Sequence, residues 1–142
     1  MPEAEGSPPG RPRLRIPPPC DELLGLVCID KSTPGTTVWE MPAVDALANP
    51  AGAVQGGLVA ALADTAMSAS AVTANRDRRL HVANTDLRIS FIRPARIPGV
   101  LTCTATVVSS GRRVAFVEAR VVDAAGALVA TASSTYLLSE RA

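Results

Sequence analysis

Charged side chains are almost absent from one long stretch in the middle of the sequence. Between Asp45 and Arg76 the only ionisable side chain is that of Asp64. Alanine and leucine are frequent between Gly57 and Thr73, and both residue types favour helix. Apolar residues occupy nearly every side of that helical wheel, which is typical of a buried helix. The sequence therefore predicts a fold built around one uncharged helix that carries a single carboxylate.

The size and composition of the chain limit the classes of protein it can belong to. Its 142 residues correspond to about one domain. The net charge of +1 and the aromatic content of 3% argue against nucleic acid or an anionic membrane as a main partner. Three cysteines are an odd number for a disulfide framework, so we expect free thiols and a cytoplasmic protein. With His81 as the only histidine, a His-rich metal site is excluded.

The beginning of the chain differs from the rest in composition. The first nineteen residues hold seven of the twelve prolines, and they contain neither the apolar region of a secretory signal nor a membrane span. We expect residues 1–19 to form a proline-rich flexible arm and residues 20–142 to form a single domain. A flap over a binding site is the alternative for the arm.

Strand patterns lie on both sides of the expected helix, separated by turn residues such as Pro98-Gly99 and Ser109-Ser110-Gly111. The expected strands cover residues 23–29, 36–41, 87–91, 101–107, 114–121 and 128–138. The order is two strands, one long helix and four antiparallel strands. The simplest packing of these parts is an α+β fold, in which one helix is wrapped by a curved antiparallel sheet of five to six strands.

Asp64 and a glycine pair upstream of it are the candidates for chemistry. A carboxylate on a buried helix is costly unless it is hydrogen-bonded, paired or used in a reaction, so Asp64 is either internally satisfied or functional. Gln55-Gly56-Gly57 precedes the helix at its expected start. The glycines either form a tight turn or expose helix N–H groups that polarise an oxygen.

The spacing of these two features has a consequence for assembly. Gly56 and Asp64 are eight residues apart, and eight residues of helix rise by about 12 Å. One reacting carbonyl therefore cannot touch both groups of the same chain. Two copies with opposed, adjacent helices bring Asp64 of one subunit to the Gly56 N–H of the other. If the pair is catalytic, the spacing predicts a homodimer with its sites at the interface, and leaves open how two dimers stack.

Several segments together resemble the hotdog-fold acyl-CoA thioesterases of the PaaI-like, phenylacetate-pathway type. The resemblance covers roughly residues 23 to 138. It rests on Asn49-Pro50, Gln55-Gly56-Gly57-Leu58, Leu62-Ala63-Asp64-Thr65-Ala66, the run from Thr85 to Pro94, Gly111-Arg112-Arg113 and Thr135-Tyr136. The coincidence of these motifs with the expected element order implies the hotdog fold.

The resemblance implies roles for five residues. Asp64 matches the helix carboxylate that acts as a nucleophile or as a general base on water. Gly56 matches the residue whose backbone N–H binds the thioester oxygen. Asn49 matches a loop residue that positions the carboxylate or the water. Thr65 is a candidate hydrogen-bond partner of the carboxylate, and Asn84 falls where a polar residue lines the pocket.

Gln55 departs from the family pattern, which has histidine before the two glycines. Glutamine can donate an N–H to a carbonyl oxygen, so polarisation of the substrate survives. It cannot transfer a proton near neutral pH as histidine does. His81 does not occupy the position of the missing histidine.

Coenzyme A carries phosphates, and guanidinium groups bind phosphates well. Arg93 and Arg112 flank expected strand ends and are candidates for that contact, with a solvated rim as the alternative. We also expect Gly57 to be a substrate-binding residue. No metal is expected, and coenzyme A enters only as part of the substrate.

The sequence thus predicts a homo-oligomeric hydrolase of acyl-CoA thioesters, a homodimer or a dimer of dimers. A non-catalytic acyl-CoA-binding or sensing protein is the alternative, because Gln55 stands where the family has histidine. A hotdog hydratase acting on enoyl-CoA is disfavoured. That chemistry calls for an Asp and a His a few residues apart, and only Asp77, in a charged loop, closely precedes His81.

Overall fold

A computed structural model describes residues 15–141. Its elements in chain order are α1 (Pro19–Leu24), β1 (Val27–Asp30), β2 (Thr36–Ala43), the 3-10 helix η1 (Asp45–Leu47), α2 (Gly56–Thr73), β3 (Leu80–Phe91), β4 (Gly99–Ser110), β5 (Val114–Val122) and β6 (Leu128–Glu140).

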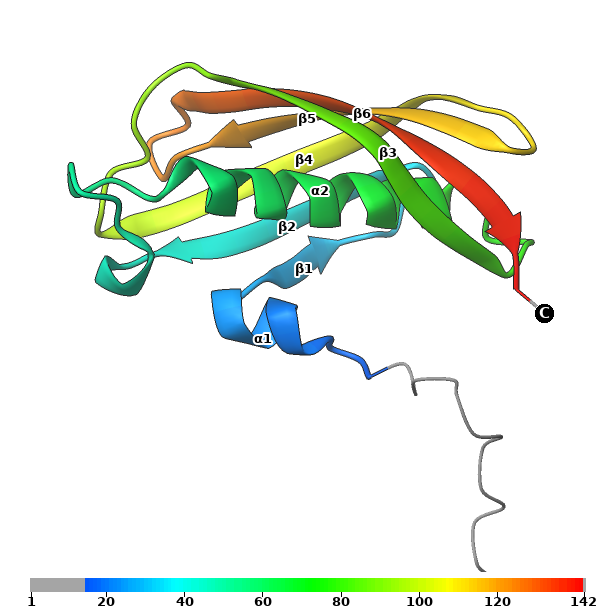
Figure 1. Ribbon diagram of the computed structural model, residues 1–142, viewed down its shortest axis with the longest axis horizontal. Coiled ribbons are helices and arrows are strands. Elements are labelled where there is room, and N and C mark those ends of the chain that lie inside the picture. The colour runs from blue at the N-terminus through cyan, green and yellow to red at the C-terminus, as the bar shows by residue number, and fades with distance from the viewer. Residues whose placement is uncertain (1–14, 142) are drawn as a thin grey trace, which may run out of the picture.

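All six strands form one antiparallel sheet in the order β1-β2-β4-β5-β6-β3. The sheet curves around α2, which is visible in Figure 1 between the two edge strands, β1 and β3. This arrangement of one long helix in a curved antiparallel sheet is the hotdog fold, so the α+β prediction is confirmed.

The core lies between α2 and the inner face of the sheet. Small and apolar helix residues such as Leu62, Ala63 and Met67 are fully buried there. Two polar side chains share this core. Thr37 on β2 donates to the Ala66 carbonyl oxygen at 2.8 Å and lies 2.9 Å from the Ser70 hydroxyl. Because both hydroxyls have partners, they fix the helix on the sheet without a desolvation cost.

The opposite side of α2 is open in the single protomer. The sequence predicts burial nearly all round, but Gly57 and Val72 are exposed and Ala60, Ala61 and Asp64 are only half-buried. The sheet of one chain covers one side of the helix, because the strands that flank it, β1 and β3, do not meet. A second layer is needed to bury the rest.

The expected strand over residues 23–29 is wrong in its first half, where the chain forms α1. Pro19 occupies the first helical position, at which its missing N–H costs nothing. Acidic residues in the first turn stabilise the helix, because their negative charge interacts favourably with the positive end of the helix dipole. Gly25 then ends the helix with φ 69°, a left-handed conformation that glycine adopts easily. α1 begins at Pro19, the last residue of the expected arm, and residues 1–14 of that arm lie outside the described part.

β3 is a twelve-residue strand at the edge of the sheet. Its pairing with β6 shifts between Asn84 and Asp86, so that Thr85 forms a bulge. Thr85 donates its hydroxyl to the Thr135 carbonyl oxygen at 3.1 Å, and the Thr135 N–H donates to the Asp86 carboxylate at 3.0 Å. Bulges of this kind redirect side chains and often lie next to functional sites. In the part of the chain that the structure describes, no helix has the length and apolar character to cross a bilayer.

Candidate functional site

Asp64 lies half-way along α2 and is held by two other elements. Its Oδ1 atom accepts a hydrogen bond from the Tyr136 hydroxyl at 2.6 Å and another from the Asn84 amide at 2.8 Å. The Tyr136 hydroxyl also lies 3.1 Å from the Asp64 carbonyl oxygen. Tyr136 is on β6 and Asn84 is on β3, where the two residues face each other across the ladder. The carboxylate is therefore anchored to the sheet.

Asn84 is itself locked in one orientation. Its Oδ1 atom accepts the Ser134 hydroxyl at 2.7 Å and the Asp86 N–H at 3.0 Å. Because the Asp86 N–H can only donate, the amide oxygen must face it, and the NH₂ group points to Asp64. Ser134 also contacts the Asp86 carbonyl oxygen. The bulge and β6 together thus orient the amide that the sequence places near the pocket.

Tyr136 and Ser134 were not singled out by the sequence for these roles. Tyr136 is the only tyrosine of the chain and its side chain is 1% exposed. Burial, and then the contact with Asp64, raise the pKa of Tyr136 far above its usual range, so its hydroxyl keeps its proton. The sequence indicates only that Tyr136 falls on the same side of β6 as the residues that face the core. It does not indicate the contact with Asp64, because the two residues are 72 positions apart.

The beginning of α2 carries the second half of the candidate machinery. Neither the Gly56 N–H nor the Gly57 N–H donates a hydrogen bond to a group among the described residues. Gln55 is the N-cap, and its Oε1 atom accepts the Leu58 N–H at 3.2 Å. The cap leaves the NH₂ group of Gln55 as a donor beside two free helix N–H groups, an arrangement that attracts a partly negative oxygen.

Beside this helix end lies a largely apolar pocket of about 380 Å³. Asn49, Gly56, Phe91 and Arg93 are among the residues that line it. Asn49 accepts the N–H groups of Ala51 and Ala53 on its Oδ1 atom, at 2.9 and 3.1 Å, and so bends the loop before α2. The ring of Phe91 lies against Gly56, since a Cβ atom there would stand 3.0 Å from the ring. An acyl chain and a carbonyl group suit this lining.

The expected site residues fall into separate groups within one protomer. Asn49, Gln55, Gly56, Gly57 and Arg93 gather at the start of α2, whereas Asp64 and Asn84 meet about 12 Å further along the helix. Thr65 makes no side-chain hydrogen bond among the described residues, so the expected Thr65–Asp64 bond is absent there. Asn84 and Tyr136 take that place because they point inward from the sheet.

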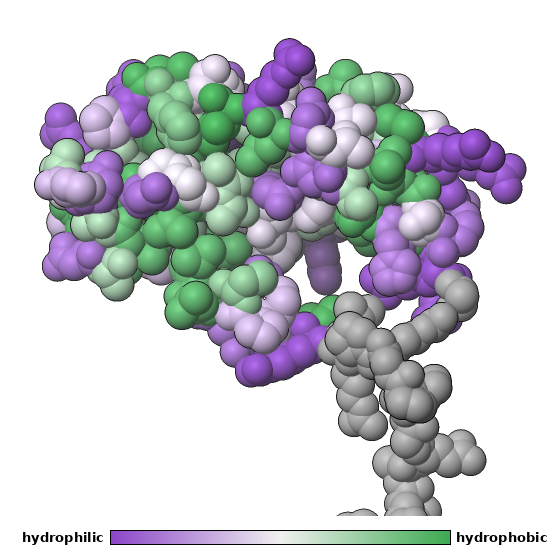
Figure 2. Space-filling model, in the orientation of Figure 1, coloured by the Kyte–Doolittle hydropathy of each residue, from purple (hydrophilic) through white to green (hydrophobic). Residues whose placement is uncertain are grey.

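Arg112 lies far from Arg93, at the opposite end of the sheet. It belongs to a basic end of the molecule, which we define as Lys31, Arg76, Arg78, Arg79, Arg112, Arg113 and Arg141. Contacts connect these residues: Arg78 donates to the Arg112 carbonyl oxygen at 2.9 Å, and Arg76 contacts the Lys31 carbonyl oxygen. A groove of about 690 Å³ runs along Lys31, Arg76 and Arg78. Hydrophilic residues crowd this end in Figure 2, at the right of the view.

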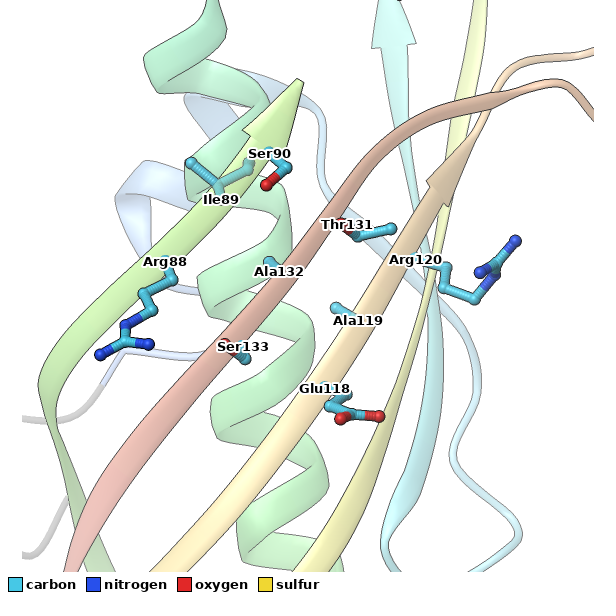
Figure 3. A pocket seen from close by; sticks show the side chains of 9 residues that line it. All are labelled: Arg88, Ile89, Ser90, Glu118, Ala119, Arg120, Thr131, Ala132 and Ser133. Carbon is cyan, nitrogen blue, oxygen red and sulfur yellow. The ribbon is translucent and has the colours of Figure 1, made fainter. Parts of the chain in front are cut away.

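A further hollow, of about 470 Å³, lies on the outer face of the sheet. Figure 3 shows Arg88, Glu118 and Arg120 around it, with α2 behind the strands. Alternate residues of β5, such as Ala119, are buried against the helix, so these charged side chains point away from Asp64. The outer hollow is therefore separate from the Asp64 site.

Comparison with known proteins decides the family. The sequence profile of the thioesterase superfamily matches residues 51–130, more than half of the chain. The chain belongs to the thioesterase superfamily. The matched segment contains α2 with Gly56 and Asp64, and β3 with Asn84. The resemblance to PaaI-like thioesterases that the sequence motifs indicate is confirmed, and thioester hydrolysis is the chemistry of the family.

Individual relatives agree with this assignment. Acyl-coenzyme A thioesterase 13 of Homo sapiens is 28% identical over 116 residues, which are 81% of this chain and 81% of that protein. The crystal structure of S. sahachiroi AziG is 30% identical, with a TM-score of 0.80 over 87% of this chain and 98% of AziG. The structure of a mutant of the phenylacetic acid degradation protein PaaI from Thermus thermophilus is 27% identical. Its TM-score is 0.76, and the match covers 84% of this chain and 98% of PaaI.

Proposed function

We propose that the protein hydrolyses acyl-coenzyme A thioesters to a free acid and coenzyme A, at a site that two protomers share. The observation that carries the proposal is the pair of groups on α2: a hydrogen-bonded Asp64 carboxylate, and free N–H groups at Gly56 and Gly57 about 12 Å away. Each is half of a thioesterase site. The human relative, whose name states an acyl-coenzyme A thioesterase, supports this substrate class.

The open side of α2 supports a dimer that joins the two halves. Opposed helices that place Asp64 of each subunit against Gly56 of the other put Ala60 at the centre of the contact. Gly57, Ala60 and Ala61 are small, so two helices can approach closely there. The long edge strand β3 lies next to the same side of α2 and offers unpaired N–H and C=O groups to a second copy.

In this dimer the reaction needs no metal and no cofactor beyond the coenzyme A of the substrate. The thioester oxygen accepts the Gly56 N–H, assisted by the NH₂ group of Gln55. Asp64 of the partner subunit removes a proton from water, and the water oxygen attacks the carbonyl carbon. The negative charge that forms on the carbonyl oxygen is held at the helix N-terminus. The C–S bond then breaks, and the coenzyme A sulfur takes the proton back from Asp64.

Direct attack by Asp64 is the other route that the same geometry permits. A carboxylate oxygen then bonds to the acyl carbon, the thiolate leaves, and water hydrolyses the mixed anhydride. A single turnover in ¹⁸O-labelled water tests for the anhydride. If water opens it at the Asp64 carbonyl, the label enters Asp64 and the acid carries an unlabelled Asp64 oxygen, which identifies the nucleophilic route. Label in the acid alone is the result of the general-base route, and also of an anhydride that water opens at the acyl carbon.

Two basic regions are candidates for the phosphates of coenzyme A. Arg93 lines the pocket beside Gly56 within the same protomer. Opposed helices also carry the basic end of the partner, with its Arg112, towards that pocket, because α2 ends next to the basic end. We assign the outer hollow, which has charges of both signs, to the pairing of two dimers. The cysteines of the described residues are free thiols, which supports a cytoplasmic location.

The decisive experiment measures thiol release from short, long and aromatic acyl-CoAs. We expect turnover by the wild type and loss of at least about a hundredfold in Asp64→Asn, which keeps the size of the side chain but removes the base. The dimer should persist in that variant. Unchanged turnover in Asp64→Asn would overturn the mechanism. Thermal stabilisation by coenzyme A without turnover of any substrate would instead favour an acyl-CoA-binding protein, the function that Gln55 in place of histidine leaves open.

A complementation test addresses the shared site. Gly56→Pro removes the N–H at the first helical position, where proline is tolerated, and Gly56→Ala keeps the N–H while adding the same contact with Phe91. Asp64→Asn and Gly56→Pro should each be inactive alone. Mixed at equal concentrations, they should regain up to about a quarter of the wild-type activity, because half of the dimers then contain one intact site. No recovery in dimers that exchange subunits would contradict a shared site.

A further inference from the structure

The two oxygens of Asp64 have different surroundings. Oδ1 accepts two hydrogen bonds, from the Tyr136 hydroxyl at 2.6 Å and from the Asn84 amide at 2.8 Å. Oδ2 has no hydrogen-bond partner among the described residues. A carboxylate held by one oxygen can rotate little about its χ angles, because both donors lose their partner when it turns. The side chain is therefore fixed with one oxygen anchored and the other available.

Both groups that contact Oδ1, the Tyr136 hydroxyl and the Asn84 amide, can act there only as hydrogen-bond donors. The Tyr136 side chain is 1% exposed, and its pKa is raised by burial first and by Asp64 second, so the hydroxyl stays protonated over the pH range in which enzymes work. Asn84 cannot turn its oxygen to Asp64, since the Asp86 N–H, which can only donate, holds that oxygen at 3.0 Å. Neither group can therefore present an acceptor to the carboxylate.

The anchoring parts come from three elements that pack together. Asp64 is on α2, Asn84 sits beside the bulge of β3, and Tyr136 lies opposite Asn84 on β6. A purely structural role for these polar groups would be served as well by apolar residues of the same shape, because a half-buried carboxylate adds a desolvation cost to the core. The arrangement is better explained by a need to aim the carboxylate.

We propose that Tyr136 is a positioning residue for Asp64, which holds Oδ1 together with Asn84 so that Oδ2 is the oxygen that reacts. The inference rests on the proposed thioester hydrolysis. In the general-base route, Oδ2 takes the proton of the water and later returns it to the coenzyme A sulfur, while Oδ1 keeps its two hydrogen bonds. In the nucleophilic route, Oδ2 forms the bond to the acyl carbon. Tyr136 touches neither substrate nor water in either route.

The test compares two variants that each remove one buried hydroxyl in contact with α2. Tyr136→Phe keeps the ring and removes the donor to Asp64. Thr37→Val removes a donor to the Ala66 carbonyl oxygen, on the side of α2 that faces the sheet. We expect kcat for acyl-CoA hydrolysis to fall about ten- to a hundredfold in Tyr136→Phe with KM within about twofold of the wild type, because the reacting oxygen is misplaced but the substrate pocket is intact.

The control separates positioning from general loss of stability. Thr37→Val should lower the melting temperature at least as much as Tyr136→Phe, because its hydroxyl is as deeply buried and contacts both the Ala66 carbonyl oxygen and the Ser70 hydroxyl, yet leave kcat within about twofold. Equal losses of kcat in both variants would overturn the proposal, and so would an unchanged kcat in Tyr136→Phe. If Tyr136→Phe does not fold, Asn84→Ala removes the second donor at an exposed position, and the same fall in kcat at constant KM is expected.

Failure of the inference can be told apart from failure of the proposed function. In an Asp64→Asn background, Tyr136→Phe should cause no further loss of turnover, since no reacting carboxylate is left to aim. An active Asp64→Asn protein would refute the role of Asp64 itself. An inactive Asp64→Asn protein together with a fully active Tyr136→Phe protein would refute only the positioning role.

Discussion

At the scale of single residues, Gln55 performs two tasks with two different atoms. Its Oε1 atom caps α2 by accepting the Leu58 N–H, and its side chain stands close to Gly57, where a Cβ atom would lie 2.8 Å from Oε1. The opposite side of the amide carries the NH₂ group that we assign to the thioester oxygen. Capping is thus a reason for glutamine to occur here that is independent of proton transfer.

A substitution can separate the two tasks of Gln55. Gln55→Glu keeps an oxygen for the cap and adds a negative charge at the helix N-terminus, so the melting temperature should stay equal or rise. Thiol release should fall at least about tenfold, because the donor is replaced by a carboxylate that repels the developing oxyanion. Gln55→Ala, the control, should lose activity and also about 1 kcal/mol of stability. Full kcat in Gln55→Glu would show that the NH₂ group takes no part.

Cys103 predicts how stability depends on pH on the alkaline side. Burial raises the pKa of this thiol from 9.0 to about 12, so the unfolded chain loses the proton first. The contribution of the buried thiol to the free energy of unfolding is therefore complete below pH 9. It is lost as the pH rises towards 12, by up to about 1.4 kcal/mol per pH unit. Urea unfolding of Cys103→Ala across this window should show a shallower fall than the wild type. Parallel slopes for the two proteins would contradict the prediction.

At the scale of elements, local sequence signals predict some parts well and others poorly. The uncharged segment around Asp64 predicts α2 and its start at the glycine pair, because propensity and capping are local. The bulge at Thr85 has no such signal, since it depends on how β3 and β6 pair across 50 residues. The hydrogen bonds of Asp64 to Tyr136 and Asn84 follow from that pairing. The sequence therefore predicts the acid and the helix end, but not the groups that orient the acid.

The end of α1 offers a prediction about backbone conformation and space. Gly25→Ala places a Cβ atom 2.9 Å from Pro42 at a φ of +69°, so it combines a clash with left-handed strain. We expect a loss of about 2–3 kcal/mol in the free energy of unfolding. Gly52→Ala is the matched control, because Gly52 has a φ of +82° but open space around it, and should lose only about 1 kcal/mol. Equal losses would show that strain alone matters.

At the scale of the whole molecule, the near-neutral charge conceals an uneven distribution. Seven basic side chains gather at the basic end, whereas Asp64 is the only charged side chain on the open side of α2. A helix surface with small residues and one carboxylate can pack against its own copy without burying further charge. In the proposed dimer, the apolar character of α2 is explained by two layers that cover it, the sheet of its own chain and the helix of the other.

This explanation predicts that assembly and activity are lost together. Ala61→Glu introduces a charge into the proposed helix contact, so the dimer should dissociate and thiol release should fall at least about a hundredfold, although the bonds of Asp64 within the protomer persist. Val72→Glu makes the same kind of change on the same helix. It lies beyond the overlap, which ends where Asp64 meets Gly56 of the other chain, so that variant should remain dimeric and keep its kcat. Only its KM for acyl-CoA should rise, because Val72 lines the groove of the basic end. Light scattering after gel filtration, with activity measured on the same fractions, checks both. A monomeric Ala61→Glu protein with wild-type turnover would mean that one protomer holds a complete site, and that Gly56 and Asp64 do not act on the same thioester.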